Sequence, residues 1–188
     1  MSTITRDAVL KPALTTDSPW HMVRQAEFDY GNESLVMTGV RPDVLFIGDS
    51  ITHLWDLQAY FGGTGKRLVN RGIGGDTTTL LRERFPADAL QLRPRRIVMK
   101  IGINDLLGGV APETVLENIV AIANDTAAAG IPLAHCSVLP IWGPSWSTES
   151  DNATRINRGV REVNAGIRDI AKRHGVLYVD YYTALVAP

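Results

Sequence analysis

One serine stands where its hydroxyl could act as a nucleophile. The segment Gly48-Asp49-Ser50-Ile51-Thr52 follows the apolar run Val44–Ile47 and precedes a helical stretch. Backbone N–H groups and the helix dipole favour negative charge at a helix N-terminus, so charge developing on an attacked carbonyl would be stabilised there. Asp and Ser are also preferred helix caps, so this segment alone fits a simple cap equally well.

Two further segments could supply hydrogen-bond donors to such a charge. Asn70–Thr77 is rich in glycine, which lets the backbone approach a ligand and point an N–H group at it. Gly102-Ile103-Asn104-Asp105 follows another apolar run and offers a side-chain amide. Because parallel strands end at the same edge of a sheet, we expect the hydroxyl, the N–H group and the amide to converge. Together they would form an oxyanion site.

These segments resemble the GDSL lipase/esterase family, also called SGNH hydrolases, in both order and spacing. Ser50 matches the family's nucleophile and first oxyanion donor, Gly75 matches its glycine donor, and Asn104 matches its asparagine donor. The resemblance runs from about Val44 to the end of the chain, and Asn70–Thr77 looks most like the platelet-activating-factor acetylhydrolase branch. It implies hydrolysis of carboxylic esters through a serine acyl-enzyme, without a cofactor.

The chain departs from the family pattern at its carboxyl end. The family's catalytic Asp and His come from an Asp-x-x-His block after the last strand, and no such block occurs up to Pro188. We therefore expect the base of Ser50 and its aspartate to lie beyond residue 188. A chain ending there would also lack the family's last helix, and the apolar patch left on one sheet face would favour a homo-oligomer.

None of the four histidines forms a convincing triad with Ser50 from its place in the sequence. His53 follows Ser50 by one helical turn and is the alternative base. His135 lies within a buried-looking strand and is expected to be a core residue with satisfied nitrogens. His174 is expected to end a helix, where the dipole favours it, and His21 to be solvated on an N-terminal helix.

The substrate is expected to be a small-molecule ester with a short acyl group, because no long apolar channel or lid helix is evident. Ile51 and Ile103 are predicted to wall the acyl pocket, with Trp142 or Trp146 covering it. The His, Asp and Glu residues show no spacing typical of metal ligands, so no metal site is predicted.

Two other function classes stay open. A non-catalytic protein could keep the oxyanion site as an acyl-binding or anion-binding pocket. This would agree with the absence of a match to the family's catalytic histidine in the sequence. A flavodoxin-like nucleotide-binding module would instead have to use the Gly48–Thr52 turn as its phosphate loop.

The elements that position these residues alternate between short apolar runs and helical stretches. The runs cover residues 44–47, 68–69, 96–101, 132–138 and 176–179. The helical stretches cover residues 19–30 (ended by Gly31), 77–91, 112–129 and 152–174. This alternation predicts a three-layer α/β/α sandwich around a flavodoxin-like, five-stranded parallel sheet, with helices on both faces. The first 17 residues are predicted to form an arm.

Length and composition favour one globular domain over residues 1–188. The net charge of -1 argues against a nucleic-acid binder, which would show a basic excess. Cys136 is the single cysteine, so an intrachain disulfide is excluded. No apolar run reaches the roughly 18–20 residues of a membrane span. The N-terminus lacks the charged-then-apolar pattern of a signal peptide, so a cytoplasmic protein is expected.

Overall fold

The computed structural model describes residues 8–13, 15–141 and 151–186, and these contain one five-stranded sheet. All neighbouring strands are parallel, in the order β2-β1-β3-β4-β5. The strands are β1 (Val44–Gly48), β2 (Leu68–Gly72), β3 (Ile97–Lys100), β4 (Leu133–Cys136) and β5 (Leu177–Val179). This is the flavodoxin-like order, and it confirms the predicted fold.

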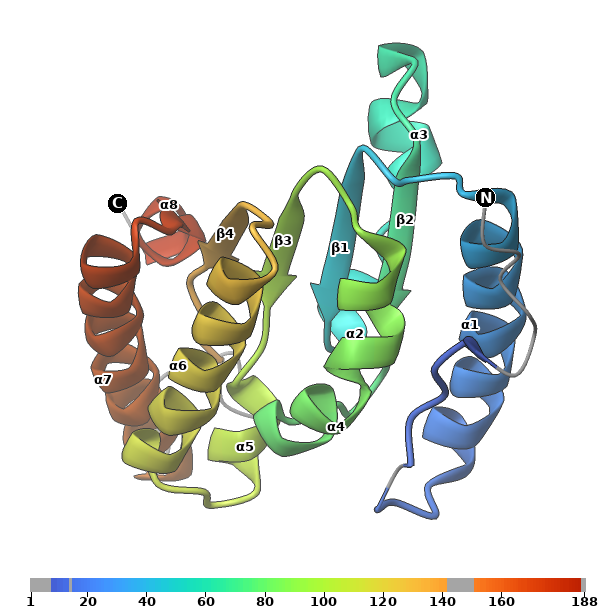
Figure 1. Cartoon of the computed structure of the whole chain (residues 1–188). Helices are drawn as coiled ribbons and strands as arrows, with labels where there is room; N and C mark the ends of the chain where they lie inside the picture. Colours follow the sequence, from blue (N-terminus) through green and yellow to red (C-terminus); the bar gives the residue numbers. More distant parts are fainter. Residues whose placement is uncertain (1–7, 14, 142–150, 187–188) are drawn as a thin grey trace.

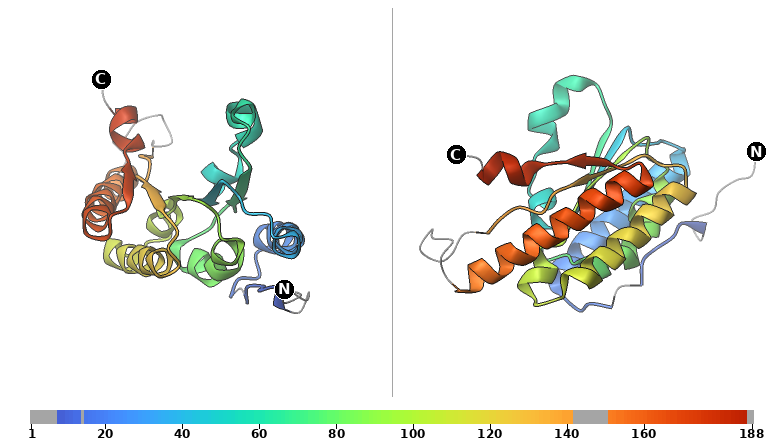
Figure 2. Two further views of the ribbon diagram at one scale, coloured as in Figure 1. Left: turned by 45° about the horizontal axis from the view of Figure 1, so that its top comes forward. Right: turned by 90° about the vertical axis from the view of Figure 1, so that its left-hand side faces the viewer.

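Helices lie on both sides of the sheet (Figure 1, Figure 2). One side carries α4 (Thr78–Asp88), α6 (Pro112–Ala128) and α7 (Asp151–His174), with α1 (Pro19–Thr38) beside α4. The other side carries α2 (Ser50–His53), α3 (Leu57–Phe61) and α8 (Tyr181–Val186). The short α5 (Ile103–Leu107) follows β3, and two 3-10 turns, Gly62–Thr64 and Leu90–Leu92, follow α3 and α4.

The main core fills the space between the sheet and α4, α6 and α7. Side chains alternate between the two faces of each strand, so Leu45 and Ile47 point to the core while Phe46 points away from it. Phe46 instead packs against the rings of Trp55 and Phe61, at 5.4 and 6.0 Å between ring centres. Aromatic rings thus cover the second face at the end of the sheet near α3.

The N-terminal helix is longer than its sequence indicates. It was expected to stop at Gly31, but α1 continues to Thr38 and ends at Gly39, which has a left-handed φ of 66°. Gly31 serves packing instead, because a Cβ there would lie 3.3 Å from Nη2 of Arg71. A glycine inside a helix costs stability but lets a large neighbour approach.

The arm before α1 packs along α4 and the turn after it. The Leu10 backbone exchanges hydrogen bonds of 2.9 Å with the Gln91 side chain, and Thr15 donates twice to Glu83. Val9 is buried. In the part of the chain that the structure describes, no helix is both long and apolar enough to cross a membrane.

His135, in β4, is a titratable group buried in the interior of the protein. It is 1% exposed, and neither ring nitrogen has a partner among the described residues. The prediction of a core residue is confirmed, but the expected hydrogen bonds are absent. Burial lowers the pKa of His135 to about 4, because the charged ring would have to lose its water.

His135 should make the protein sensitive to acid. Since its pKa is lower in the folded chain than the usual 6.5, the unfolded state takes up a proton first, and stability falls as the pH drops from 6.5 towards 4. Between about pH 7 and pH 5 this single group should remove about 2 kcal/mol. In urea unfolding, the free energy of unfolding of His135→Leu should fall by about 2 kcal/mol less than that of the wild type over the same pH range. If the free energy of unfolding changed equally with pH in the two proteins, His135 would not be the source of the acid sensitivity.

Candidate functional site

The turn from β1 into α2 places Ser50 at the carboxyl end of a central strand. Asp49 caps α2 by accepting a 2.9 Å hydrogen bond from the Ile51 N–H, and Ser50 is the half-buried first residue of the helix. Gly48 has a φ of 152°, and a Cβ there would lie 1.9 Å from the Lys100 carbonyl oxygen. The turn therefore needs glycine at this position.

A buried ion pair joins this turn to the neighbouring strand. The Lys100 ammonium lies 3.5 Å from Oδ2 of Asp49, and the two side chains are 8% and 0% exposed. Burial raises the pKa of Asp49 and lowers that of Lys100, although each charge opposes the shift of the other. The residue before Ser50 is thus tied to the neighbouring strand β3.

The glycine-rich loop after β2 lies against α2. A Cβ at Gly72 would lie 2.2 Å from the backbone nitrogen of His53, so this glycine allows strand and helix to touch. A Cβ at Gly74 would lie 3.9 Å from the Ser50 Cβ, which places the loop directly beside the serine. Gly75 is exposed, with a left-handed φ of 80° that favours glycine.

Asn104, after β3, bonds to the same loop from its other side. Its amide donates a 2.8 Å hydrogen bond to the backbone carbonyl of Asp76. Asp105 accepts hydrogen bonds from the N–H and the hydroxyl of Thr78, the latter at 2.6 Å. The loop is therefore held between Ser50 and Asn104, and the sheet brings together the segments of all three predicted site residues.

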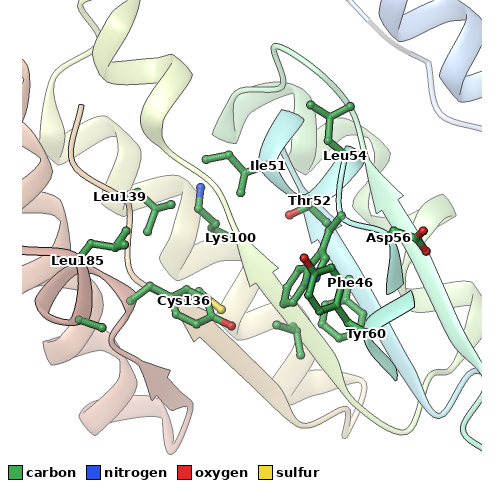
Figure 3. A pocket seen from close by; sticks show the side chains of 14 residues that line it. Phe46, Ile51, Thr52, Leu54, Asp56, Tyr60, Lys100, Cys136, Leu139 and Leu185 are labelled. Atoms are coloured by element: carbon green, nitrogen blue, oxygen red, sulfur yellow. The ribbon is translucent and has the colours of Figure 1, made fainter. Parts of the chain in front are cut away.

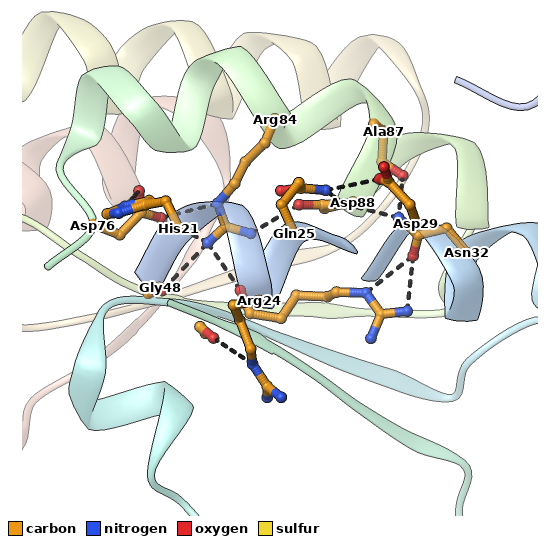
Figure 4. A network of polar contacts seen from close by, with 12 residues as sticks. His21, Arg24, Gln25, Asp29, Asn32, Gly48, Asp76, Arg84, Ala87 and Asp88 are labelled. Carbon is orange, nitrogen blue, oxygen red and sulfur yellow. Dashed lines mark hydrogen bonds and ion pairs between the residues drawn. The ribbon is translucent and has the colours of Figure 1, made fainter. Parts of the chain in front are cut away.

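The side chain of Asp76 lies at one end of a buried polar network (Figure 4). Arg84 of α4 donates to Oδ2 of Asp76 through Nε and Nη2, at 3.0 and 2.6 Å, and to Asp88 through Nη1 at 3.1 Å. Its Nη2 also donates to the backbone carbonyls of Gly48 and Arg71. Arg84 and both carboxylates are 0% exposed. Nearby Asp76 and Asp88 raise the pKa of Arg84 against the effect of burial, so it stays charged.

His21 belongs to this network, which the sequence did not indicate. It was expected to be solvated, but it is 3% exposed, and its Nε2 lies 3.4 Å from Oδ1 of Asp76. Its Cε1 would be 3.8 Å from a Cβ at Gly75. No periodic apolar pattern marked this buried face of α1, because the face is formed by the polar residues His21, Gln25 and Asn32 together with Phe28.

None of the histidines, all of which lie in described segments, forms a hydrogen bond with Ser50. His53 faces Gly74, as Ser50 does, since its Nδ1 would lie 3.9 Å from a Cβ there. Burial lowers the pKa of His53, and the charge of Arg24 lowers it further. His135 is enclosed in β4, and His174 is the last residue of α7, as predicted.

A separate apolar groove of about 710 Å³ lies on the second face of the sheet (Figure 3). Its walls are α2, the segment that follows it and α8, and its floor contains Phe46, Val98 and Cys136. Ser50, Gly75 and Asn104 do not line it.

The three residues predicted for the acyl pocket fall in different places. Ile51 is 41% exposed and lines the groove, whereas Ile103 is 7% exposed and belongs to the main core. Trp142 and the alternative Trp146 lie outside the described residues. The pocket assignment therefore stays a prediction.

The model of the GDSL-like lipase/acylhydrolase family matches residues 46–188. The chain belongs to this family. The match includes Ser50, Gly75 and Asn104 and begins after α1, so it does not cover His21.

Several named proteins are similar to this member of the GDSL family. Esterase TesA of Pseudomonas aeruginosa is 30% identical over 55% of this chain and 58% of its own length. An acetylxylan esterase of Geobacillus stearothermophilus is 40% identical over 27% of this chain and 23% of its own length. The matches thus span less than two thirds of either curated relative. A solved structure from Streptococcus pneumonia, described as a platelet activating factor, is 29% identical with a TM-score of 0.74, over 89% of this chain and 79% of that one.

Loss of the Arg84 guanidinium should destabilise the fold severely. Arg84→Met leaves Asp76 and Asp88 buried without their partner, and breaking such a pair costs about 3–5 kcal/mol. Arg82→Met is the matched control, because Arg82 is an exposed residue of the same helix that bonds only to Asn118 among the described residues. It should cost about 0.5 kcal/mol in urea unfolding. Similar losses for the two variants would show that Arg84 is not the centre of the network.

Proposed function

We propose that the protein hydrolyses carboxylic esters through an acyl-enzyme formed on Ser50. The observation that carries this proposal is the position of Ser50 at the start of α2, beside Gly74 in the glycine loop that Asn104 holds from the other side. A hydroxyl nucleophile next to converging N–H donors is the arrangement that acyl transfer requires.

Three donors would hold the oxyanion of the tetrahedral intermediate: the N–H groups of Ser50 and Gly75 and the amide of Asn104. An asparagine amide has two hydrogens, and one of them is used by the Asp76 carbonyl. The second is free for the oxyanion, with its direction fixed by the first. The positive φ of Gly75 orients the peptide group of the exposed loop.

The serine also needs a base to accept its proton. Because no histidine in the described residues bonds to Ser50, we propose that the catalytic His and its Asp come from beyond residue 188. His53 is the alternative, since it faces Gly74 together with Ser50. The base would take the proton as Ser50 attacks and return it to the leaving alcohol.

We propose a short-acyl ester as the substrate. The large apolar groove has no wall formed by Ser50, so it offers no long acyl channel at the nucleophile. One relative is named an acetylxylan esterase, which acts on an acetyl ester by its name. A non-catalytic acyl-binding protein is the competing function, favoured by the absence of a histidine bonded to Ser50 in the described part of the chain.

Replacement of the nucleophile should abolish turnover. In the full-length natural protein, Ser50→Ala should remove nearly all hydrolysis of p-nitrophenyl acetate, while the fold loses at most about 1 kcal/mol. Ser18→Ala is the control, because this serine makes no side-chain cap bond. A fluorophosphonate probe should label Ser50, as located by mass spectrometry.

Two outcomes would contradict this proposal. Substantial turnover by Ser50→Ala would exclude Ser50 as the nucleophile. A wild-type protein that neither turns over esters nor reacts with the probe would favour the binding function. Faster hydrolysis of the decanoate than of the acetate ester would contradict the short-acyl assignment alone.

Removal of the Asn104 amide should slow the chemical step. Asn104→Ala is expected to lower kcat by roughly 10²–10³-fold with a smaller effect on KM, because one preorganised oxyanion donor is lost. The assay is steady-state hydrolysis of p-nitrophenyl acetate, with circular dichroism to confirm folding. A rise in KM at unchanged kcat would make Asn104 a contact to the ground-state substrate instead.

A further inference from the structure

The imidazole of His21 touches the glycine loop at two adjacent residues. Its Nε2 lies 3.4 Å from Oδ1 of Asp76, and its Cε1 would be 3.8 Å from a Cβ at Gly75. Both Arg84 bonds to Asp76 go to Oδ2. Within the described residues, His21 is therefore the side chain that engages the other carboxylate oxygen.

The same two residues carry the proposed oxyanion geometry. The exposed N–H of Gly75 is one proposed donor, and the carbonyl of Asp76 accepts the bond that orients the Asn104 amide. The bonds of the Asp76 side chain anchor the backbone of this residue, so a displacement of Asp76 on loss of an anchor would shift its carbonyl and the adjacent Gly75, and with them two of the three donors. Displacements of about 1 Å in such a constellation can change rates by about 10²-fold.

Packing alone does not explain a histidine at this position. The ring is 3% exposed, and its Nδ1 is buried without a hydrogen-bond partner among the described residues. A buried polar atom without a partner is unfavourable, and a phenyl ring of similar shape would avoid that cost. What a phenyl ring could not supply is the contact from Nε2 to Asp76.

We propose that His21 is a positioning residue, through which α1 holds Gly75 and Asp76 in the positions needed for oxyanion binding. This inference rests on the proposed function. The family match begins at residue 46, so it does not include this contribution of α1.

Gln25 provides a matched control on the same helix. It lies one turn after His21, is 6% exposed, and donates a 3.0 Å hydrogen bond to Asp88. Asp88 is the second carboxylate bound by Arg84, and it lies away from Asp76 in the network. Gln25→Leu therefore weakens the attachment of α1 to the same network without touching the glycine loop (Figure 4).

The test compares kcat and KM for p-nitrophenyl acetate in the full-length protein, with Tm measured for each variant. His21→Phe should lower kcat about 10- to 100-fold with KM changed less than about threefold, because the ring remains but the contact to Asp76 is lost. His21→Gln, whose amide can reach Asp76, should recover kcat to within about threefold of wild type. Gln25→Leu should lower Tm with kcat unchanged.

Other outcomes overturn the inference. If His21→Phe and Gln25→Leu have the same kcat, or if His21→Gln is no better than His21→Phe, His21 has only a structural role. If His21→Phe does not fold, His21→Asn takes its place, since this shorter amide cannot reach Asp76, and the same comparison with His21→Gln decides. Ser50→Ala is assayed in parallel. If this variant is active, both the proposed function and the inference about His21 are wrong. If it is inactive and the His21 variants keep the wild-type kcat, only the inference is wrong.

Discussion

The buried guanidinium of Arg84 is the interaction on which the rest of the site depends. It binds the carboxylates of Asp76 and Asp88 and the backbone carbonyls of Gly48 and Arg71. These acceptors belong to the end of β1, to β2, to the glycine loop and to α4, so one side chain joins four segments near the turn that carries Ser50. Because the charges are fully buried, none of them can exchange its partner for water.

A second buried network fixes the other side of the loop. Asp105 accepts both the N–H and the hydroxyl of Thr78, and the amide of Asn118 on α6 donates to the same hydroxyl at 2.9 Å. The turn after β3 is therefore locked to the first residue of α4. Asn104 precedes Asp105, so its amide is presented by a segment that cannot move independently of the loop it contacts. Preorganisation of this kind is what makes a hydrogen-bond donor effective towards developing charge.

The central sheet and its edge could be predicted from the sequence because each short apolar run is followed by a polar motif. Ser50, Gly75 and Asn104 each follow such a run, and parallel pairing necessarily brings their segments to one edge. The catalytic base could not be placed, since the motif that would supply it does not occur in the chain. The residues of the acyl pocket could not be predicted either. Tertiary packing leaves Ile51 exposed and buries Ile103, and the local sequence does not show this difference.

The N-terminal helix shows why local sequence patterns do not predict a buried helix face when the buried side chains are polar. Hydrophobic periodicity detects a helix face only when that face is apolar, and α1 contacts the glycine loop, α4 and β2 through His21, Gln25 and Asn32. Asn32 alone accepts two bonds from Arg71 and donates to Asp88. Each of these three polar side chains is matched by a charged group more than 35 positions away in the chain, a relation that no local window contains.

The short helix α2 lies between the glycine loop and the apolar groove and contributes residues to both. Ser50 faces the glycine loop, whereas Ile51 and Thr52 line the apolar groove on the sheet face. The Lys100 ammonium lies in the groove and reaches Asp49, the cap of the same helix. The turn that carries Ser50 is thus positioned from two directions, by the glycine loop beside it and by the ion pair between Asp49 and Lys100.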